Sequence, residues 1–111
     1  GSAPTFFTSL MLGAQGGVMA LACVIPDACV RIYELVRAGR YDEARDLQRQ
    51  VTPLAKLVTS IHGIPGLKAA LQAIGYVGGP PRQPLEPVGD DAVAQITREI
   101  DQLTAVTSDV A

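Results

Sequence analysis

The sequence predicts an α/β fold of which this chain holds mostly the helical part. Apolar residues recur at helical spacing in five segments, which favours five helices. One short run, VMALACV at 18–24, is apolar throughout and follows two glycines, a pattern typical of a strand buried on both faces. No partner strand is recognisable, although the backbone groups of a buried strand need hydrogen-bonding neighbours. The sequence therefore predicts a larger sheet that includes residues beyond this chain.

The composition narrows the class of protein. A chain of 111 residues suits one domain at most, and its 48% of hydrophobic residues can bury a core. Because only 5% of the residues are aromatic, that core is expected to consist of Ala, Val, Leu and Ile. The net charge of −2 is spread without a basic run, so no nucleic-acid partner is expected. No apolar stretch approaches the roughly 20 residues that span a bilayer, so no membrane segment is expected.

Cys23 and Cys29 are expected to be free, buried thiols, because two cysteines do not make a disulfide framework. Free thiols are typical of a reducing compartment. The only histidine, His62, has no Cys, Asp or Glu at metal-ligand spacing, so no metal site is predicted. The N-terminus has no charged region before an apolar run, as a signal peptide would have. We expect a protein that is cytoplasmic or mitochondrial and not secreted, and the compartment itself stays undetermined because a targeting segment would lie upstream of this chain.

Residues 1–40 are predicted to form a helix, a strand and a second helix. Ser2 can cap the first helix, and Gly13 ends it. Two glycines then supply a tight turn before the strand at about 17–24. A proline and an aspartate open the second helix, at about 26–38, and its apolar residues form one stripe.

Residues 41–111 are predicted to form a helical extension. A long helix from about 42 to 61 has one apolar face, and Pro53 should kink it because proline lacks a backbone donor. A short helix follows at about 63–75. A connector with four of the eight prolines then precedes the last amphipathic helix. The tail after Ala105 is expected to fray.

Two segments carry a resemblance to a known family. They are LGAQGGVMALACVIP at 12–26 and GIPGLKAALQAIGYVGGPPRQPLEP at 63–87. In this order they resemble the C-terminal part of the dihydrodipicolinate synthase and N-acetylneuraminate lyase family of aldolases, most of all 4-hydroxy-2-oxoglutarate aldolases. Cys23 departs from the pattern, since related sequences often carry Asn there.

The resemblance implies the fold of the whole protein. That family forms a (β/α)8 TIM barrel with a three-helix C-terminal extension, so the chain would be the C-terminal fragment of a barrel of about 250 residues. Residues 1–7 would be the loop after the seventh strand and the start of the next helix, and 17–24 would be the eighth strand. The missing N-terminal part of the barrel would be the natural partner, and the intact protein would be a homotetramer.

The resemblance also implies a pyruvate-dependent Schiff-base, or class I, aldolase or lyase without cofactor or metal. The parent would cleave 4-hydroxy-2-oxoglutarate or a similar 2-oxo acid to pyruvate and an aldehyde. Its lysine nucleophile and its proton-relaying tyrosine are implied to lie upstream of Gly1. The chain would therefore hold no catalytic residue and be inactive alone. Gly1, Ser2 and Val18 are implied to bind substrate, the last through its backbone carbonyl.

Other interpretations of the same residues stay open. Gly1 and Ser2 can be read as only a helix-capping turn, and Val18 as only a core residue. Lys56 and Lys68 are interpreted as exposed helix charges rather than nucleophiles. Within the family, a dihydrodipicolinate synthase or a 2-keto-3-deoxy sugar acid aldolase is the alternative. Outside it, the alternative is a freestanding helical interaction module.

Overall fold

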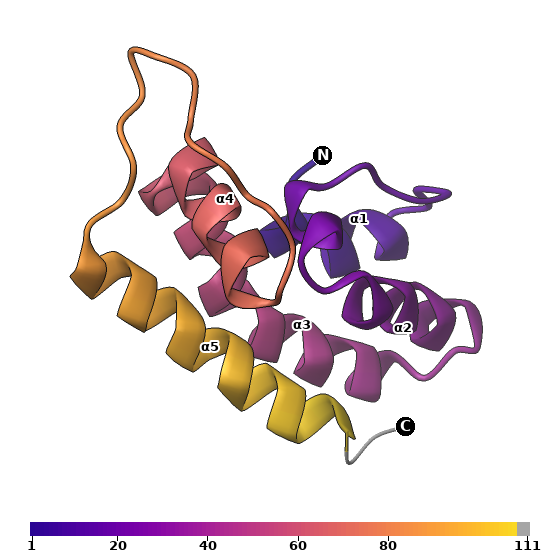
Figure 1. Ribbon diagram of the computed structural model, residues 1–111. Helices are drawn as coiled ribbons and strands as arrows, with labels where there is room; N and C mark the ends of the chain where they lie inside the picture. Colours follow the sequence, from indigo (N-terminus) through magenta and orange to yellow (C-terminus); the bar gives the residue numbers. More distant parts are fainter. Residues whose placement is uncertain (109–111) are drawn as a thin grey trace.

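The computed structural model describes residues 1–108, which fold into helices joined by turns and, before the last helix, by a long loop (Figure 1). No strand occurs among these described residues. Two elements are turns of 3-10 helix (η1 and η2), one is a π-helix (η3) and the others are α-helices. In chain order they are η1 (Ala3–Thr5), α1 (Phe6–Met11), η2 (Ala20–Cys23), α2 (Pro26–Arg37), α3 (Tyr41–Lys56), η3 (Leu57–Ile61), α4 (Gly63–Ala73) and α5 (Asp90–Ser108).

Helix α3 forms the middle of the structure, with α1 and α2 on one side and α5 along the other (Figure 1). Helix α4 packs on η3 and on α5, and η2 packs on α2. The largest fully buried side chains come from η2, α2, α3, η3 and α5, and they are Leu21, Ile32, Val51, Leu54, Val58 and Ile96. One aliphatic core thus joins the predicted segments 1–40 and 41–111, and the division between them stays a prediction.

The helices predicted from apolar spacing are confirmed. Elements η1 and α1 cover the first predicted helix, and α2 covers the second. Gly13 and Gly39, which follow α1 and α2, have φ angles of +103° and +76°, a left-handed conformation that favours glycine. Helix α5 continues to Ser108, past Ala105 where fraying was expected, and the last three residues of that tail lie outside the described part.

The predicted strand at 17–24 is wrong for most of its length. Met19 is extended, with φ −139° and ψ 140°, but Ala20–Cys23 forms the 3-10 turn η2. Leu21 and Val24 are one 3-10 turn apart, and both reach the core with 0% and 5% of their surface exposed. A short apolar run does not by itself distinguish a strand from a helical turn. The described residues also offer no strand that could pair with this segment.

The long predicted helix changes its winding near its end. Beyond α3 it continues as the π turn η3, closed by a hydrogen bond of 3.1 Å from the backbone nitrogen of His62 to the carbonyl oxygen of Leu57. Pro53, for which a kink was predicted, lies inside α3. Gly66 of α4 packs against the π turn so closely that a Cβ there would lie 2.8 Å from the Leu57 oxygen. A glycine at this position therefore lets α4 lie directly on η3.

Candidate functional site

The three predicted substrate-binding residues lie on two segments that meet at the N-terminus. The amino nitrogen of Gly1 donates a hydrogen bond of 2.9 Å to the backbone carbonyl oxygen of Val18. Ser2 follows in an extended conformation and leads into η1. Gly1, Ser2 and Val18 are all exposed. The fold thus brings the residues before η1 beside the extended segment before η2.

Thr5, rather than the side chain of Ser2, makes the hydrogen bonds of the turn at η1. The backbone nitrogen and Oγ1 of Thr5 both donate to the carbonyl oxygen of Ser2, at 3.2 and 3.1 Å. The hydroxyl of Ser2 makes no capping hydrogen bond. The alternative that Ser2 caps a helix through its side chain is therefore not supported. An exposed hydroxyl in this position is able to donate a hydrogen bond to a ligand and to accept one.

Val18 is not a core residue in this structure. Its side chain is 88% exposed, and that of Leu12, just after α1, is 85% exposed. The expectation that Val18 is buried is wrong for the described residues, because no neighbouring strand covers this segment. Burying both side chains against another part of a protein would remove a substantial apolar area from water, which is favourable.

Gln48 of α3 joins the N-terminal turn to α3 by hydrogen bonds, and sequence analysis missed this residue. Its buried Oε1 accepts a hydrogen bond of 2.8 Å from the backbone nitrogen of Phe7, and its Nε2 donates one of 3.0 Å to the carbonyl oxygen of Ala3. A signal was present in the sequence. Gln48 lies between Ala44 and Val51 on the apolar face of the helix, where a polar side chain needs a hydrogen-bond partner.

Lys56 lies in α3 and Lys68 lies in α4. Lys56 is exposed at the end of α3. Nζ of Lys68, in α4, donates a hydrogen bond of 3.1 Å to the carbonyl oxygen of Gly78. Among residues 1–108, no three His, Cys, Asp or Glu side chains are grouped as metal ligands. None of the helices in this described range is long and apolar enough to cross a membrane.

The two cysteines are free thiols in different surroundings. Cys29 of α2 is buried, and burial raises the pKa of its thiol because an apolar environment disfavours the thiolate. Cys23, at the end of η2, is exposed. The prediction that both thiols are buried is therefore wrong for Cys23. The 3-10 turn directs Leu21 into the core and leaves the side chain two residues later in solvent.

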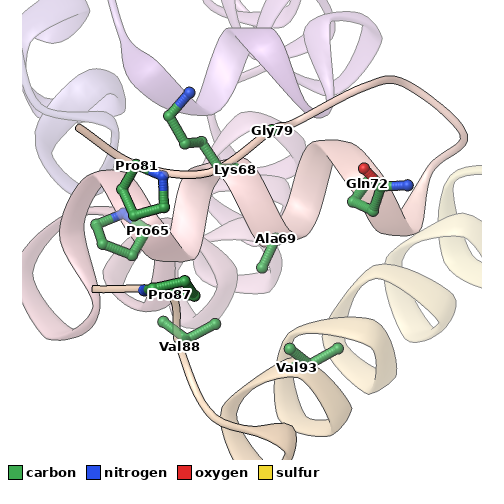
Figure 2. Close-up of a pocket in the computed structure, with 9 residues that line it drawn as sticks. All are labelled: Pro65, Lys68, Ala69, Gln72, Gly79, Pro81, Pro87, Val88 and Val93. Carbon is green, nitrogen blue, oxygen red and sulfur yellow. The ribbon is translucent and has the colours of Figure 1, made fainter. Parts of the chain in front are cut away.

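A shallow groove lies between α4, the start of α5 and the connector, residues 74–89, that joins these helices (Figure 2). Its volume is about 220 Å³. Its lining is mostly apolar and consists of Pro65, Lys68, Ala69, Gln72, Gly79, Pro81, Pro87, Val88 and Val93. The two polar side chains of this set hold the connector, since Lys68 donates to the Gly78 oxygen and Oε1 of Gln72 accepts from the Gly78 nitrogen at 3.3 Å. The hydrogen bonds of Lys68 and Gln72 to the connector therefore explain why two polar side chains line this apolar groove, without a ligand.

A solved structure defines the class of fold to which this helical unit corresponds. A dihydrodipicolinate synthase-like protein from Thermus thermophilus matches with a TM-score of 0.85 and 36% sequence identity. The match covers 96% of this chain but only 37% of that one. Because the neighbour is a TIM barrel, the α/β prediction is confirmed: the chain has the fold of the C-terminal fragment of such a barrel, in its mostly helical part.

The chain belongs to the dihydrodipicolinate synthetase family, whose model matches residues 1–103. The 4-hydroxy-tetrahydrodipicolinate synthase of Exiguobacterium sp. is 39% identical to it over 85% of this chain and 32% of the relative. A protein of Emericella nidulans named "Probable 4-hydroxy-2-oxoglutarate aldolase, mitochondrial" is 38% identical over 85% of this chain and 31% of the relative. The resemblance noted in the sequence is confirmed, and the chain spans about a third of the length of these relatives.

Proposed function

We propose that this chain is the C-terminal part of a pyruvate-dependent Schiff-base aldolase or lyase, active when joined to the upstream part of its barrel. The observation that carries the proposal is the family match over residues 1–103. The short share of the relatives that the chain covers, 31% and 32%, supports the view that it is a part. The substrate proposed for the parent is 4-hydroxy-2-oxoglutarate or a similar 2-oxo acid, cleaved to pyruvate and an aldehyde.

The proposed chemistry needs a lysine amine that adds to the keto carbon of the substrate. Loss of water gives a protonated imine. The 4-hydroxyl group of the substrate loses its proton to the relay tyrosine, the bond between C3 and C4 breaks to release the aldehyde, and the imine accepts the electron pair. Protonation of the resulting enamine and hydrolysis of the imine then release pyruvate and regenerate the lysine. We place this lysine and the proton-relaying tyrosine upstream of Gly1. Lys56 is exposed, and Lys68 already donates to Gly78, so neither suits the role.

Gly1, Ser2 and Val18 are proposed to form part of the rim of the pyruvate site. Glycine permits a close approach of the ligand, and the Ser2 hydroxyl, which caps no helix, suits a substrate carboxylate. The carbonyl oxygen of Val18 accepts from Gly1. A carbonyl oxygen has two lone pairs, so this bond leaves one that can accept a hydrogen bond from the N–H of the protonated imine.

The upstream barrel is the proposed partner of the exposed apolar side chains. Leu12 and Val18 are largely exposed, and Met11 and Val30 are about half exposed. These residues lie at or near α1 and η2 and on α2, where the barrel fold places the neighbouring strands and helices. The homotetramer implied by the resemblance is likewise proposed for the intact parent.

Three alternative functions are kept, two of them enzymes of the same family. Relatives at 39% and 38% identity carry different enzyme names, so a dihydrodipicolinate synthase is an alternative to the aldolase. A 2-keto-3-deoxy sugar acid aldolase is the same kind of alternative. A freestanding helical interaction module is the alternative outside this chemistry. A lysine in an apolar strand shortly upstream of Gly1 would favour the enzyme, and a start codon there would favour the module.

The test compares the 111-residue chain with the parent, expressed with its upstream coding sequence. Each is incubated with pyruvate and borohydride, and the intact mass is measured. The parent should gain one reduced pyruvyl group, and the chain alone should gain none. Borohydride without pyruvate is the control. An adduct on Lys56 or Lys68 of the isolated chain, or a parent that forms no adduct, would contradict the proposal.

A further inference from the structure

Both amide hydrogens and the amide oxygen of Gln48 take part in hydrogen bonds. Oε1 accepts from the backbone nitrogen of Phe7 at 2.8 Å. The two hydrogens of Nε2 are donated to the carbonyl oxygen of Ala3 at 3.0 Å and to Oγ1 of Thr52 at 3.1 Å. Thr52 Oγ1 in turn donates to the carbonyl oxygen of Gln48 at 2.6 Å. These partners fix which end of the amide is oxygen and which is nitrogen, because Phe7 can only donate and Ala3 can only accept.

These bonds replace a cap that the N-terminal turn lacks. Thr5, the residue before α1, makes no side-chain capping bond to that helix, because its hydroxyl is donated to the carbonyl oxygen of Ser2. The first backbone donors of a helix have no partner within the helix. Gln48 supplies one for Phe7 from a position 41 residues further along the chain, on α3.

Gln48 bonds the backbone of the turn at two points, Ala3 before Thr5 and Phe7 after it. Ala3 follows Ser2 directly, and its carbonyl oxygen accepts both the Gln48 amide and the backbone nitrogen of Phe6. The bond from Gly1 to Val18 fixes the other end of the same turn. The backbone of the turn from which the exposed Ser2 side chain projects is therefore held next to Ser2, at Ala3, by a buried amide on α3.

We propose that Gln48 is a positioning residue for substrate binding, acting through Ser2, an inference that rests on the proposed function above. Gln48 is buried and does not touch the ligand; it orients the turn whose Ser2 hydroxyl bonds the substrate carboxylate. Thr52 in turn orients the Gln48 amide, because its Oγ1 accepts a hydrogen bond from Gln48 Nε2. The carboxylate is present in the substrate, in the imine and in pyruvate. Loss of the correct turn should therefore weaken binding in all these states and affect KM more than kcat.

The test uses the parent enzyme with Gln48→Met, a side chain of similar length without hydrogen-bonding groups. The pyruvate concentration for half-maximal borohydride trapping should rise about tenfold, the effect expected when a hydrogen bond to a charged group is lost. The KM for 4-hydroxy-2-oxoglutarate should rise by a similar factor, while kcat changes by less than about threefold. Gln50→Met, an exposed position on the same helix, is the matched control and should change neither quantity.

A double variant separates positioning from general destabilisation. In a Ser2→Ala background, Gln48→Met should raise the half-saturating pyruvate concentration by less than about twofold, because the group it positions is already absent. Equal effects of Gln48→Met with and without the Ser2 hydroxyl would overturn the proposal. If Gln48→Met does not fold, Thr52→Val serves in its place, with a smaller increase of half-saturating pyruvate in the same direction; an unchanged value in folded Thr52→Val would overturn it.

Failure of this inference is distinguishable from failure of the proposed function. A wild-type parent that forms no pyruvyl adduct contradicts the proposed function itself. A wild-type parent that forms the adduct, beside a folded Gln48→Met with unchanged half-saturation, contradicts only the role given to Gln48.

Discussion

Gly78 lies in direct contact with the backbone of Lys68: a Cβ at residue 78 would stand 2.0 Å from the Lys68 carbonyl oxygen. The same two residues are joined by the hydrogen bond from Nζ of Lys68 to the Gly78 carbonyl oxygen, at 3.1 Å. Oε1 of Gln72 accepts from the Gly78 nitrogen one helical turn further along α4. The connector is thus fastened to α4 at one glycine before it loops out toward α5 (Figure 1).

Gly78→Ala should detach this part of the connector, because the new methyl group collides with backbone that cannot move aside. We expect a loss of about 1–3 kcal/mol in the free energy of unfolding of the isolated chain, measured by thermal or urea unfolding. Gly89→Ala is the matched control within the connector, since a Cβ there has open space. Equal stability of the two variants would show that the contact at Gly78 does not exist in solution.

Lys68→Met should remove the hydrogen bond to Gly78 while keeping the aliphatic part of the side chain. The expected cost is about 1 kcal/mol of unfolding free energy, since the bond is partly buried. Lys56→Met, at an exposed position, should leave the stability unchanged. Urea unfolding of both variants beside wild type measures the difference. A Lys68→Met variant as stable as Lys56→Met would mean that the lysine is only a solvated helix charge.

Gly17→Ala should strain the contact between the segment before η2 and α1. A Cβ at residue 17 would lie 3.0 Å from Cε1 and 3.2 Å from Cδ1 of the buried Phe6 ring, which must shift. Gly16→Ala meets no atom within 4 Å and should be neutral or slightly stabilising, because alanine restricts the unfolded chain. The melting temperature of Gly17→Ala is therefore expected to fall below that of Gly16→Ala. The reverse order would contradict the packing of Gly17 on Phe6.

Iodoacetamide should label Cys23 of the folded chain well before Cys29. The thiolate is the reactive form, and burial raises the pKa of the Cys29 thiol, so less of it is ionised at any given pH. Labelling of Cys29 should speed up only above the pH at which an ordinary thiol ionises, and both cysteines should react alike in urea. Mass spectrometry of peptides after timed quenching gives the two rates. Comparable rates in the folded chain would place Cys29 in solvent.

Val18→Asp should have different effects in the isolated chain and in the parent. In the chain the side chain is 88% exposed, so the unfolding free energy should change by no more than about 0.5 kcal/mol. Val77→Asp, 90% exposed on the connector, is the matched control there. In the parent, where the barrel is proposed to cover Val18, an unpaired buried carboxylate should cost several kcal/mol and reduce soluble yield and turnover. A parent that tolerates Val18→Asp would show that this segment stays in solvent.

The helices could be predicted from sequence because each buries one stripe of side chains against a shared core. The spacing of Ala44, Leu47, Val51 and Leu54 specifies such a stripe, and all four are buried in α3. The strand could not be predicted in the same way. An unbroken apolar run such as 18–24 fits both a buried strand and a helical turn. Which of the two forms depends on the segments that pack against the run, and these lie elsewhere in the sequence.

The resemblance predicted that the segments of Gly1 and Val18 meet, but the side chain that holds the turn beside them was not predicted, and the binding role of these residues stays a prediction. Gly1 and Val18 were expected near one another only through the resemblance, and the structure joins them by a hydrogen bond. The role of Gln48 escaped prediction because its partners are backbone groups of Ala3 and Phe7, which leave no trace in the amino-acid sequence. A buried glutamine on an apolar face signals only that some partner exists, not which one.

The two hydrogen bonds that join Gln48 to Ala3 and Phe7 also set an order of events during synthesis. Residues 1–7 leave the ribosome before α3 has been made, and the glutamine that bonds Phe7 and Ala3 follows them by 41 and 45 residues. The turn at Ser2 therefore cannot take its final form until α3 has emerged and packed against α1, since distant contacts form only when both ends are available. A chain released before residue 48 would carry the residues of the turn without the amide that shapes them.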